Sequence, residues 1–282
     1  MEQAVVFGDH QHLVGILNKA KDLTEVNKHN KHKNTSKVAM ILVTPGMLHS
    51  AGPFGMYKDI ADKNAEQGIT SLRFDLSGIG ESLGVGVSGR SIDRAVKEIT
   101  QAMDFLCKDH GFEAFILFGF CSGTDDSVQT ALQDERVKGV IALDGLYYKT
   151  LKHRFHWGVI MLKKLIVWKK WQAILQKNRN KLIPVSLANG EDVREFPDTS
   201  QQAVREFQQL VDRGTQLHFI YTGGMDGYNY AQQFYDMLPG VKWKGTDTTI
   251  FFPHIDHVAI LCEDREEVVN NITQNTLKMA NA

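Results

Sequence analysis

One short segment constrains the fold more than any other part of the chain. The apolar run Ala114–Phe118 leads directly into Gly119-Phe120-Cys121-Ser122-Gly123, and a helical pattern follows over Gly123–Gln133. An unbroken apolar run that ends at glycine predicts a strand buried on both faces. A side chain with reactive chemistry, Cys121, lies in the tight turn between this strand and the helix. The segment therefore predicts an α/β architecture with a nucleophile at the end of a strand.

Apolar runs and helical patterns alternate along the rest of the chain, which is typical of a mostly parallel sheet with helices on both faces. The first two expected strands flank Gly8-Asp9 and predict an opening antiparallel hairpin. We expect strands at Ala4–Phe7, His12–Leu17, Val38–Val43, Thr70–Phe74, Ala114–Phe118, Val137–Leu143, Gln216–Thr222 and Thr248–Phe252. We expect helices at Tyr57–Glu66, Ser91–His110, Gly123–Gln133, Ser200–Arg213, Tyr228–Met237 and Arg265–Met279.

Charge is unevenly distributed in this chain of 282 residues, although 32 basic against 33 acidic residues leave a net charge of only −1. The stretch Gly145–Gly190 has no Asp or Glu but eight Lys and two Arg, so the remainder has 22 basic and 33 acidic residues. A near-neutral chain is not expected to bind nucleic acid, which selects strongly basic domains. The odd number of cysteines, three, favours the reducing cytoplasm over a disulfide framework.

The basic stretch divides the chain into a catalytic core, residues 1–145 and 200–282, and a basic, aromatic-rich helical cap at 146–199. His156, Lys163, Lys170 and Lys177 recur every seven residues, which places them on one side of a helix. These lysines are either simply solvated or form a cationic surface for an anionic partner. Suitable partners are an acyl carrier protein, a coenzyme A thioester or an anionic membrane surface. Trp157, Lys163 and Lys170 are the candidate binding residues, and lysines interrupt the stretch too often for a membrane span.

The turn around Cys121 resembles the nucleophile elbow of an α/β-hydrolase, with cysteine where serine usually stands. Glycines at 119 and 123 fit because side chains flanking so tight a turn would collide. The backbone N–H of Ser122 would face the reacting oxygen at the start of the helix. Two alternatives stay open: Cys121 is a small buried hydrophobe, or Ser122 is the reactive group. Cys107 and Cys262 are expected to be structural.

In this fold the acid and then the histidine follow the nucleophile along the chain. Asp226 follows the strand Gln216–Thr222 and is the favoured acid, whereas Asp144, directly after Val137–Leu143, is the rival. His257 follows the last strand and is the favoured base, with His254 as the runner-up.

Two loops complete the expected site. Residues 44–49, Thr-Pro-Gly-Met-Leu-His, follow a core strand, and the backbone N–H of Met47 is expected to join Ser122 in the oxyanion hole. The glycines after Asp75 match neither a dinucleotide fingerprint nor a P-loop, so Asp75 is expected to hydrogen-bond backbone in a structural turn. The spacing of cysteines and histidines does not indicate zinc, and we expect neither a metal nor another cofactor.

Several of these segments resemble the α/β-hydrolases found beside exosortase systems. They are residues 72–82, 119–123 and 256–257, and the similarity extends to residues 140–144 and 148–150. The resemblance covers most of the chain and implies the fold and the nucleophile, whereas residues 45–49 depart from the Gly-Gly common at that place. The cysteine elbow is also similar to those of dienelactone hydrolases, which hydrolyse, and of polyhydroxyalkanoate synthases, which transfer acyl groups.

Together these patterns predict an enzyme with a Cys121–His257–Asp226 triad that cleaves an ester or thioester through an S-acyl intermediate. One alternative is an acyltransferase that passes the acyl group from a thioester carrier to an alcohol or amine. The other is a non-catalytic binding protein that has kept the hydrolase fold.

Overall fold

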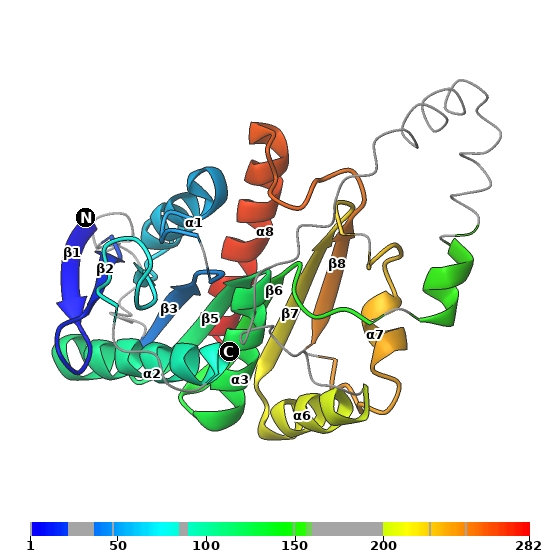
Figure 1. The fold of residues 1–282 in the computed structure, drawn as a ribbon, viewed down its shortest axis with the longest axis horizontal. Coiled ribbons are helices and arrows are strands. Elements are labelled where there is room, and N and C mark those ends of the chain that lie inside the picture. The colour runs from blue at the N-terminus through cyan, green and yellow to red at the C-terminus, as the bar shows by residue number, and fades with distance from the viewer. Residues whose placement is uncertain are drawn as a thin grey trace, which may run out of the picture.

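A twisted sheet of eight strands runs through the molecule in the order β1-β2-β4-β3-β5-β6-β7-β8 (Figure 1). The structure, a computed structural model, describes residues 2–21, 37–46, 48–84, 90–148, 150–156, 158, 200–225, 227–245 and 247–282. The strands are β1 (Glu2–Phe7), β2 (Leu13–Asn18), β3 (Val38–Val43), β4 (Ser71–Phe74), β5 (Ala114–Phe120), β6 (Val137–Leu143), β7 (Gln216–Thr222) and β8 (Thr248–Phe252).

The strands that carry the expected site are all parallel. Only β1 and β2 run against their neighbours, as the predicted opening hairpin requires. In the centre, Phe120 of β5 pairs with Leu143 of β6, and Leu143 pairs with Ile220 of β7. Because this register aligns the carboxyl ends of three neighbouring strands, the residues that follow them meet at one edge of the sheet.

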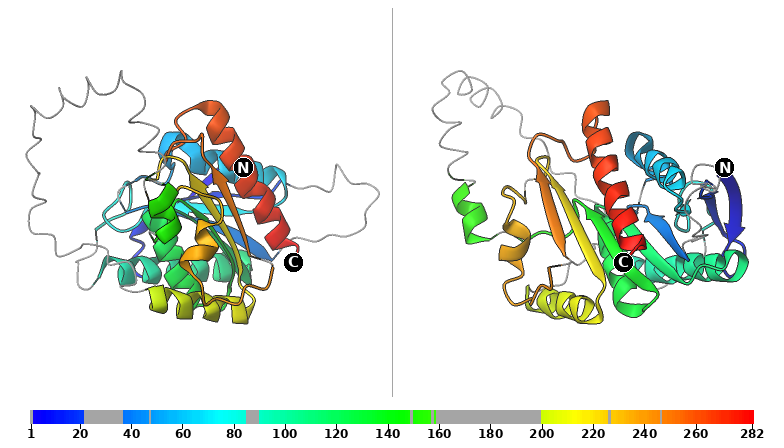
Figure 2. Two further views of the ribbon diagram at one scale, coloured as in Figure 1. Left: turned by 90° about the vertical axis from the view of Figure 1, so that its right-hand side faces the viewer. Right: turned by 180° about the vertical axis from the view of Figure 1, so that it is seen from behind.

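Helices cover both faces of the sheet, as Figure 2 shows from two further directions. Helices α1 and α8 pack on one face, and α2, α3 and α6 pack on the other. The helices are α1 (Met56–Glu66), α2 (Ser91–His110), α3 (Ser122–Gln133), α6 (Ser200–Arg213), α7 (Gln233–Met237) and α8 (Cys262–Ala280), with a 3₁₀ turn at Pro53–Gly55.

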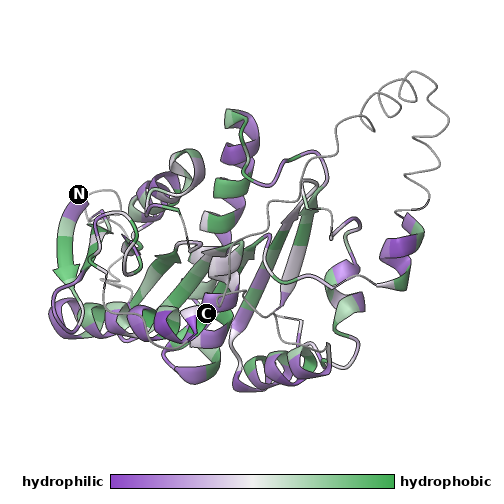
Figure 3. Cartoon of the chain, viewed as in Figure 1, coloured by the Kyte–Doolittle hydropathy of each residue, from purple (hydrophilic) through white to green (hydrophobic). Residues whose placement is uncertain are grey.

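The core forms two layers, because successive side chains of each strand point to opposite faces of the sheet. In β3, Ala39, Ile41 and Val43 face the layer under α2, whereas Met40 and Leu42 face the layer under α1 and α8. Strands that point apolar side chains to both faces must be apolar throughout, and Figure 3 shows the central strands as hydrophobic and the outer faces of the helices as hydrophilic. The sheet order, the parallel centre and the covering helices confirm the predicted α/β-hydrolase fold.

The expected elements are confirmed with small shifts in their bounds and one larger correction. The helix predicted over Tyr228–Met237 begins only at Gln233. The preceding residues form turns, in which the backbone N–H of Asn229 donates to the side chain of Gln233 (3.0 Å) instead of entering a helix. The final helix is longer than predicted, because it starts at Cys262 rather than at Arg265. Within the described ranges, no helix is long and apolar enough to cross a bilayer.

Candidate active site

Cys121 occupies a strained backbone position between β5 and α3. Its φ of 51° lies in the left-handed region, which residues other than glycine seldom adopt. Two hydrogen bonds hold the turn: the Cys121 N–H donates to the carbonyl of Leu143 (2.8 Å), and the Thr124 N–H donates to the carbonyl of Cys121 (3.1 Å). The strain turns the Cys121 side chain outward at the end of the strand, as at the elbow of a hydrolase.

The glycines on either side of Cys121 are needed for close backbone contact. A Cβ added at Gly119 would lie 2.2 Å from the carbonyl oxygen of Gly123, and one added at Gly123 would lie 2.6 Å from that of Val43. Both obstacles are main-chain atoms, which cannot rotate away as a side chain does. The expected steric role of the two glycines is confirmed.

Asp144 lies next to the elbow because it directly follows β6, the neighbour of β5. Its φ is also positive, at 50°, and its side chain is buried. Oδ1 accepts the backbone N–H of Thr222 (2.7 Å), and Oδ2 accepts the hydroxyl of the same residue (2.5 Å). Residue Thr222 of β7 therefore holds the carboxylate in place independently of His257.

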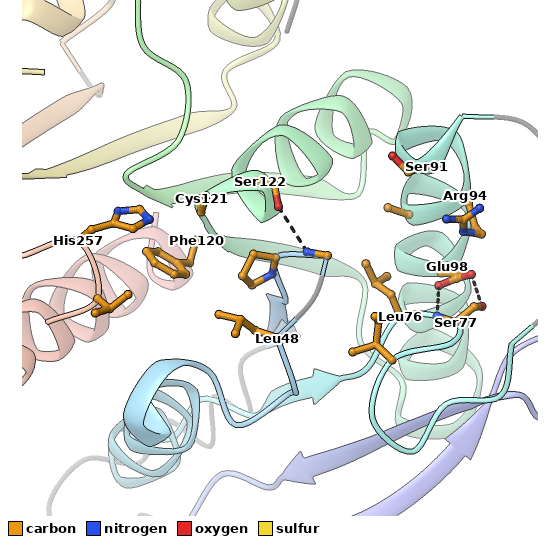
Figure 4. Close-up of a pocket in the computed structure, with 15 residues that line it drawn as sticks. Leu48, Leu76, Ser77, Ser91, Arg94, Glu98, Phe120, Cys121, Ser122 and His257 are labelled. Atoms are coloured by element: carbon orange, nitrogen blue, oxygen red, sulfur yellow. Dashed lines mark hydrogen bonds between the residues drawn. The ribbon is translucent and has the colours of Figure 1, made fainter. Parts of the chain in front are cut away.

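His257 bridges this carboxylate and the thiol. Its Nδ1 lies 3.0 Å from Oδ2 of Asp144, and its side chain lies beside Cys121, with which it lines the same cavity. An ionised carboxylate only accepts hydrogen bonds, so Nδ1 carries the proton toward Asp144 and Nε2 is left for the sulfur. The Phe120 ring packs against the imidazole with its centroid 4.8 Å away (Figure 4).

The loop that carries His257 packs tightly against the end of β7. A Cβ at Gly223 would lie 2.2 Å from the carbonyl oxygen of Pro253, and one at Gly224 would lie 2.2 Å from the backbone nitrogen of His257. Asp256 fastens the other side of the loop, because its carboxylate accepts the N–H groups of Val258 and Ile260. The histidine is therefore held by backbone packing on both sides.

The electrostatics of this contact favour a charged imidazole. The hydrogen bond to Asp144, together with the neighbouring Cys121, raises the pKa of His257 from its usual value near 6.5 to about 9, although partial burial opposes the shift. His257 is consequently protonated at neutral pH and can stabilise a thiolate on Cys121.

The acid that faces His257 is Asp144, the rival candidate from the sequence. Asp226, the favoured acid, lies outside the described residues. His254, the runner-up base, is half-exposed, and its Nε2 lies 3.1 Å from Glu267 on α8. Of the expected catalytic residues, the structure brings Cys121 and His257 together.

Ser122 begins α3, where unpaired N–H groups and the helix dipole favour negative charge. The Ser122 hydroxyl accepts the N–H of Gly46 (3.4 Å), which ties the loop after β3 to the start of the helix. Among the described contacts, its hydroxyl has no bond to His257. The Ser122 hydroxyl thus contacts the loop after β3 and not the histidine, and Met47, the other expected oxyanion donor, lies outside the described residues.

Asp75 holds the loop after β3 from its other end, a role that the expectation of a simple turn missed. Its carboxylate accepts the N–H of Ser50 (2.6 Å) and that of Glu81 (3.3 Å). The expectation that it binds backbone is confirmed, and the loop it fixes is the one that leads from Thr44 past the elbow. The glycines that follow Asp75 are the feature of the sequence that pointed to a tight turn around this carboxylate.

A cavity of about 600 Å³ opens beside the thiol and extends to α2 (Figure 4). This volume suits a small organic substrate. Cys121, Ser122 and His257 lie at one end, and Leu48, Leu76 and Ile79 supply apolar walls. The cap residues Trp157, Lys163 and Lys170 lie outside the described residues.

Comparison with known proteins supports a hydrolase. A family model described as serine aminopeptidase, S33, matches residues 35–235. No curated protein matches the chain.

Solved structures share the fold over nearly the whole chain. An esterase of Pyrococcus furiosus is 14% identical with a TM-score of 0.62, and the match covers 100% of this chain and 91% of that chain. The esterase domain of a Rhodothermus marinus protein is 13% identical with a TM-score of 0.58 and 99% coverage of both chains. A Xanthomonas campestris serine hydrolase described as having no lid is 14% identical with a TM-score of 0.54, covering 99% of this chain and 93% of that one. At these identities the likeness shows the fold alone.

Proposed function

The chain belongs to the serine aminopeptidase S33 family of hydrolases, and from that premise we propose that it cleaves an ester or thioester with Cys121 as nucleophile. The observation that carries the proposal is the placement of His257 between the Asp144 carboxylate, 3.0 Å away, and the Cys121 thiol. Nucleophile, base and orienting acid are the three parts that covalent acyl chemistry requires.

In the first half of the reaction the Cys121 thiolate attacks the carbonyl carbon of the substrate. The oxygen becomes negative and is stabilised by the N–H of Ser122 at the start of α3. The tetrahedral species collapses, the bond from carbon to the leaving oxygen or sulfur breaks, and the protonated His257 gives its proton to the leaving group. An S-acyl enzyme and an alcohol or thiol result.

In the second half neutral His257 takes a proton from water as that water attacks the S-acyl carbon. The carbon–sulfur bond breaks, the carboxylic acid leaves, and the imidazolium again faces a thiolate. Asp144 stays ionised throughout and holds the imidazole through Nδ1.

The proposal departs from the family description in its nucleophile, because that description names serine whereas this elbow carries Cys121. A thiol nucleophile needs a reducing environment, and the described structure has three free cysteines, so the proposal includes a cytoplasmic location. A thioester intermediate also reacts readily with amines, which makes acyl transfer the outcome to separate from hydrolysis.

Trapping the acyl-enzyme tests the proposal. Brief incubation with p-nitrophenyl butyrate, acid quench and peptide mass spectrometry should find one butyryl group on the Cys121 peptide. Cys121→Ala should lose the label, and Cys262→Ala, which removes an exposed thiol outside the cavity, should keep it. Label that survives in Cys121→Ala, or no label and no turnover, would contradict the proposal. Repeating the reaction with an added amine and measuring amide against acid separates transfer from hydrolysis.

A further inference from the structure

One face of α2 forms the end of the cavity opposite the thiol. Ser91, Arg94, Ala95 and Glu98 all line it, and their spacing of three, four and seven residues places them on a single side of the helix. Figure 4 shows Arg94 and Ser91 on this helix, across the cavity from Cys121. The cavity thus has a reactive end and a polar end, with leucine side chains between them.

Arg94 has an unused hydrogen-bond donor at this polar end. Its Nη1 is buried and makes no hydrogen bond in the part of the chain that the structure describes. An arginine cannot lose its proton at any ordinary pH, so this buried donor remains charged. Leaving such a group without an acceptor is unfavourable, and proteins seldom do so outside functional sites.

The neighbouring charges are already engaged with other partners. Glu98 accepts both the N–H of Ser77 (2.8 Å) and the Ser77 hydroxyl. Arg90, which lies four residues before Arg94 at the start of α2, forms two hydrogen bonds with Asp93 (3.0 and 2.8 Å). Among the described residues, no ion pair joins Arg94 to a carboxylate. The first turn of α2, which has no side-chain cap, adds the positive end of the helix dipole.

We propose that Arg94 binds an anionic group of the substrate at the end of the cavity remote from Cys121, and so selects anionic esters or thioesters over neutral ones. The inference rests on the proposed function, because it assigns the substrate class of the same site. A carboxylate or phosphate matches the charge and the planar donor geometry of the guanidinium, which lines the cavity beside Ser91. The anion belongs either to the acyl group or to the leaving group.

Two pairs of esters test the proposal and locate the anion. On the acyl side, mono-p-nitrophenyl glutarate is compared with p-nitrophenyl pentanoate, which has a methyl group in place of the carboxylate. On the leaving-group side, 4-carboxyphenyl butyrate is compared with phenyl butyrate. In each pair the measured quantity is the ratio of kcat/KM for the anionic ester to that for the neutral one, so intrinsic reactivity cancels between variants.

In one of the two pairs, Arg94→Gln should lower this ratio about 10- to 100-fold, the range expected for a hydrogen bond to a charged group. Arg94→Lys, which keeps the charge, should restore part of it. The matched control is Arg90→Gln, which removes an exposed arginine at the start of the same helix and should leave both ratios unchanged. Ratios that are the same in wild type and Arg94→Gln for both pairs would overturn the proposal.

A binding measurement separates this proposal from the catalytic one. If the neutral esters turn over through Cys121 while Arg94→Gln changes neither ratio, the proposed function stands and the anion site fails. If no ester turns over, calorimetry on the Cys121→Ala protein compares 4-carbamoylbutanoate with pentanamide for the acyl side, and N-(4-carboxyphenyl)butanamide with N-phenylbutanamide for the leaving-group side. Tighter binding of the anion in one pair that Arg94→Gln removes supports the site, and equal binding in both pairs overturns it.

Discussion

Cys121 and Asp144 have nearly the same unusual backbone torsion, with φ values of 51° and 50°, at the ends of two hydrogen-bonded strands. The residues before them, Phe120 and Leu143, are paired across β5 and β6, so both turns leave the sheet at the same level. The Cys121 N–H also donates to the Leu143 carbonyl. The proposed nucleophile and the proposed acid are therefore positioned by one pair of strands, and His257 enters between them from the loop after β8.

The alkaline limb of the pH profile should report His257. The proton on His257 is bound below pH 9 and lost as the pH rises through about 9, because Asp144 and Cys121 raise its pKa to that value. Loss of the imidazolium removes both the partner of the thiolate and the proton for the leaving group. We expect kcat/KM for a neutral ester to fall above pH 9, measured by initial rates from pH 6 to 10.5. A rate that keeps rising through pH 10 would contradict this assignment.

Replacing the thiol by a hydroxyl should reverse that pH dependence. A serine needs neutral His257 as its base, and Asp144, the main cause of the raised pKa of His257, still favours the protonated imidazole in this variant. Cys121→Ser should therefore be at least about 100-fold slower than wild type at pH 7 and should become faster toward pH 9. Initial rates for both proteins across one buffer series check this. A parallel fall of both rates above pH 9 would exclude the thiolate–imidazolium pair.

The identity of the acid can be settled with two matched substitutions. Asp144→Asn keeps the size of the side chain but removes the charge that orients Nδ1 of His257, so kcat should fall by about 10² to 10⁴. The alkaline limb should also move to lower pH, since the main cause of the raised pKa is gone. Asp226→Asn is the control and should change kcat less than about tenfold. The reverse order of effects would return the role to Asp226.

The Ser122→Ala variant tests whether the Ser122 hydroxyl holds the loop after β3 or attacks the substrate. This hydroxyl accepts one long hydrogen bond from Gly46, so its loss should lower kcat by less than about tenfold through a looser oxyanion loop. Steady-state rates with the esters above are sufficient. A loss as large as that of Cys121→Ala would make Ser122 the nucleophile.

The elbow should be intolerant of a single methyl group. Gly123→Ala would place its Cβ 2.6 Å from a backbone oxygen of β3, which should destabilise the protein by at least about 3 kcal/mol. Gly111→Ala, at the end of α2, has a positive φ but no atom within 4 Å of the added Cβ, so about 1–2 kcal/mol is expected. Urea unfolding of the two variants measures the difference, and a loss for Gly123→Ala no larger than that for Gly111→Ala would contradict the steric clash, because Gly123 does not have a positive φ.

Sequence patterns predicted most of the fold because the residues within each segment determine whether it forms a strand, a turn or a helix. The run from Ala114 to Gln133 contains its own strand, turn glycines and helix, and the structure differs there only in the exact ends of β5 and α3. The helix expected from Tyr228 has apolar spacing of the right period. Its first residues instead serve tertiary packing, in which the rings of Tyr221 and Tyr228 stack with centroids 3.7 Å apart. Such a contact between a strand and a loop residue leaves no mark on helical periodicity.

The choice between the two acids illustrates what a sequence pattern lacks. Asp144 and Asp226 both follow an apolar strand, and both precede glycine. What distinguishes Asp144 is a positive φ and two hydrogen bonds to Thr222, 78 residues away in the chain. The unpaired donor of Arg94 is equally invisible in the sequence, because it depends on what the neighbours bind.

Anchoring the acid on β6 changes which parts of this scaffold are open to variation. The loop after β7 must keep Gly223 and Gly224, because their backbone lies against Pro253 and His257. Beyond these two glycines, Tyr228 stacks on Tyr221 of β7, so this part of the loop has a packing role. None of the described residues of this loop lines the cavity, whereas Leu48, Leu76 and Ile79 do, so directed evolution of substrate preference should begin at those three positions.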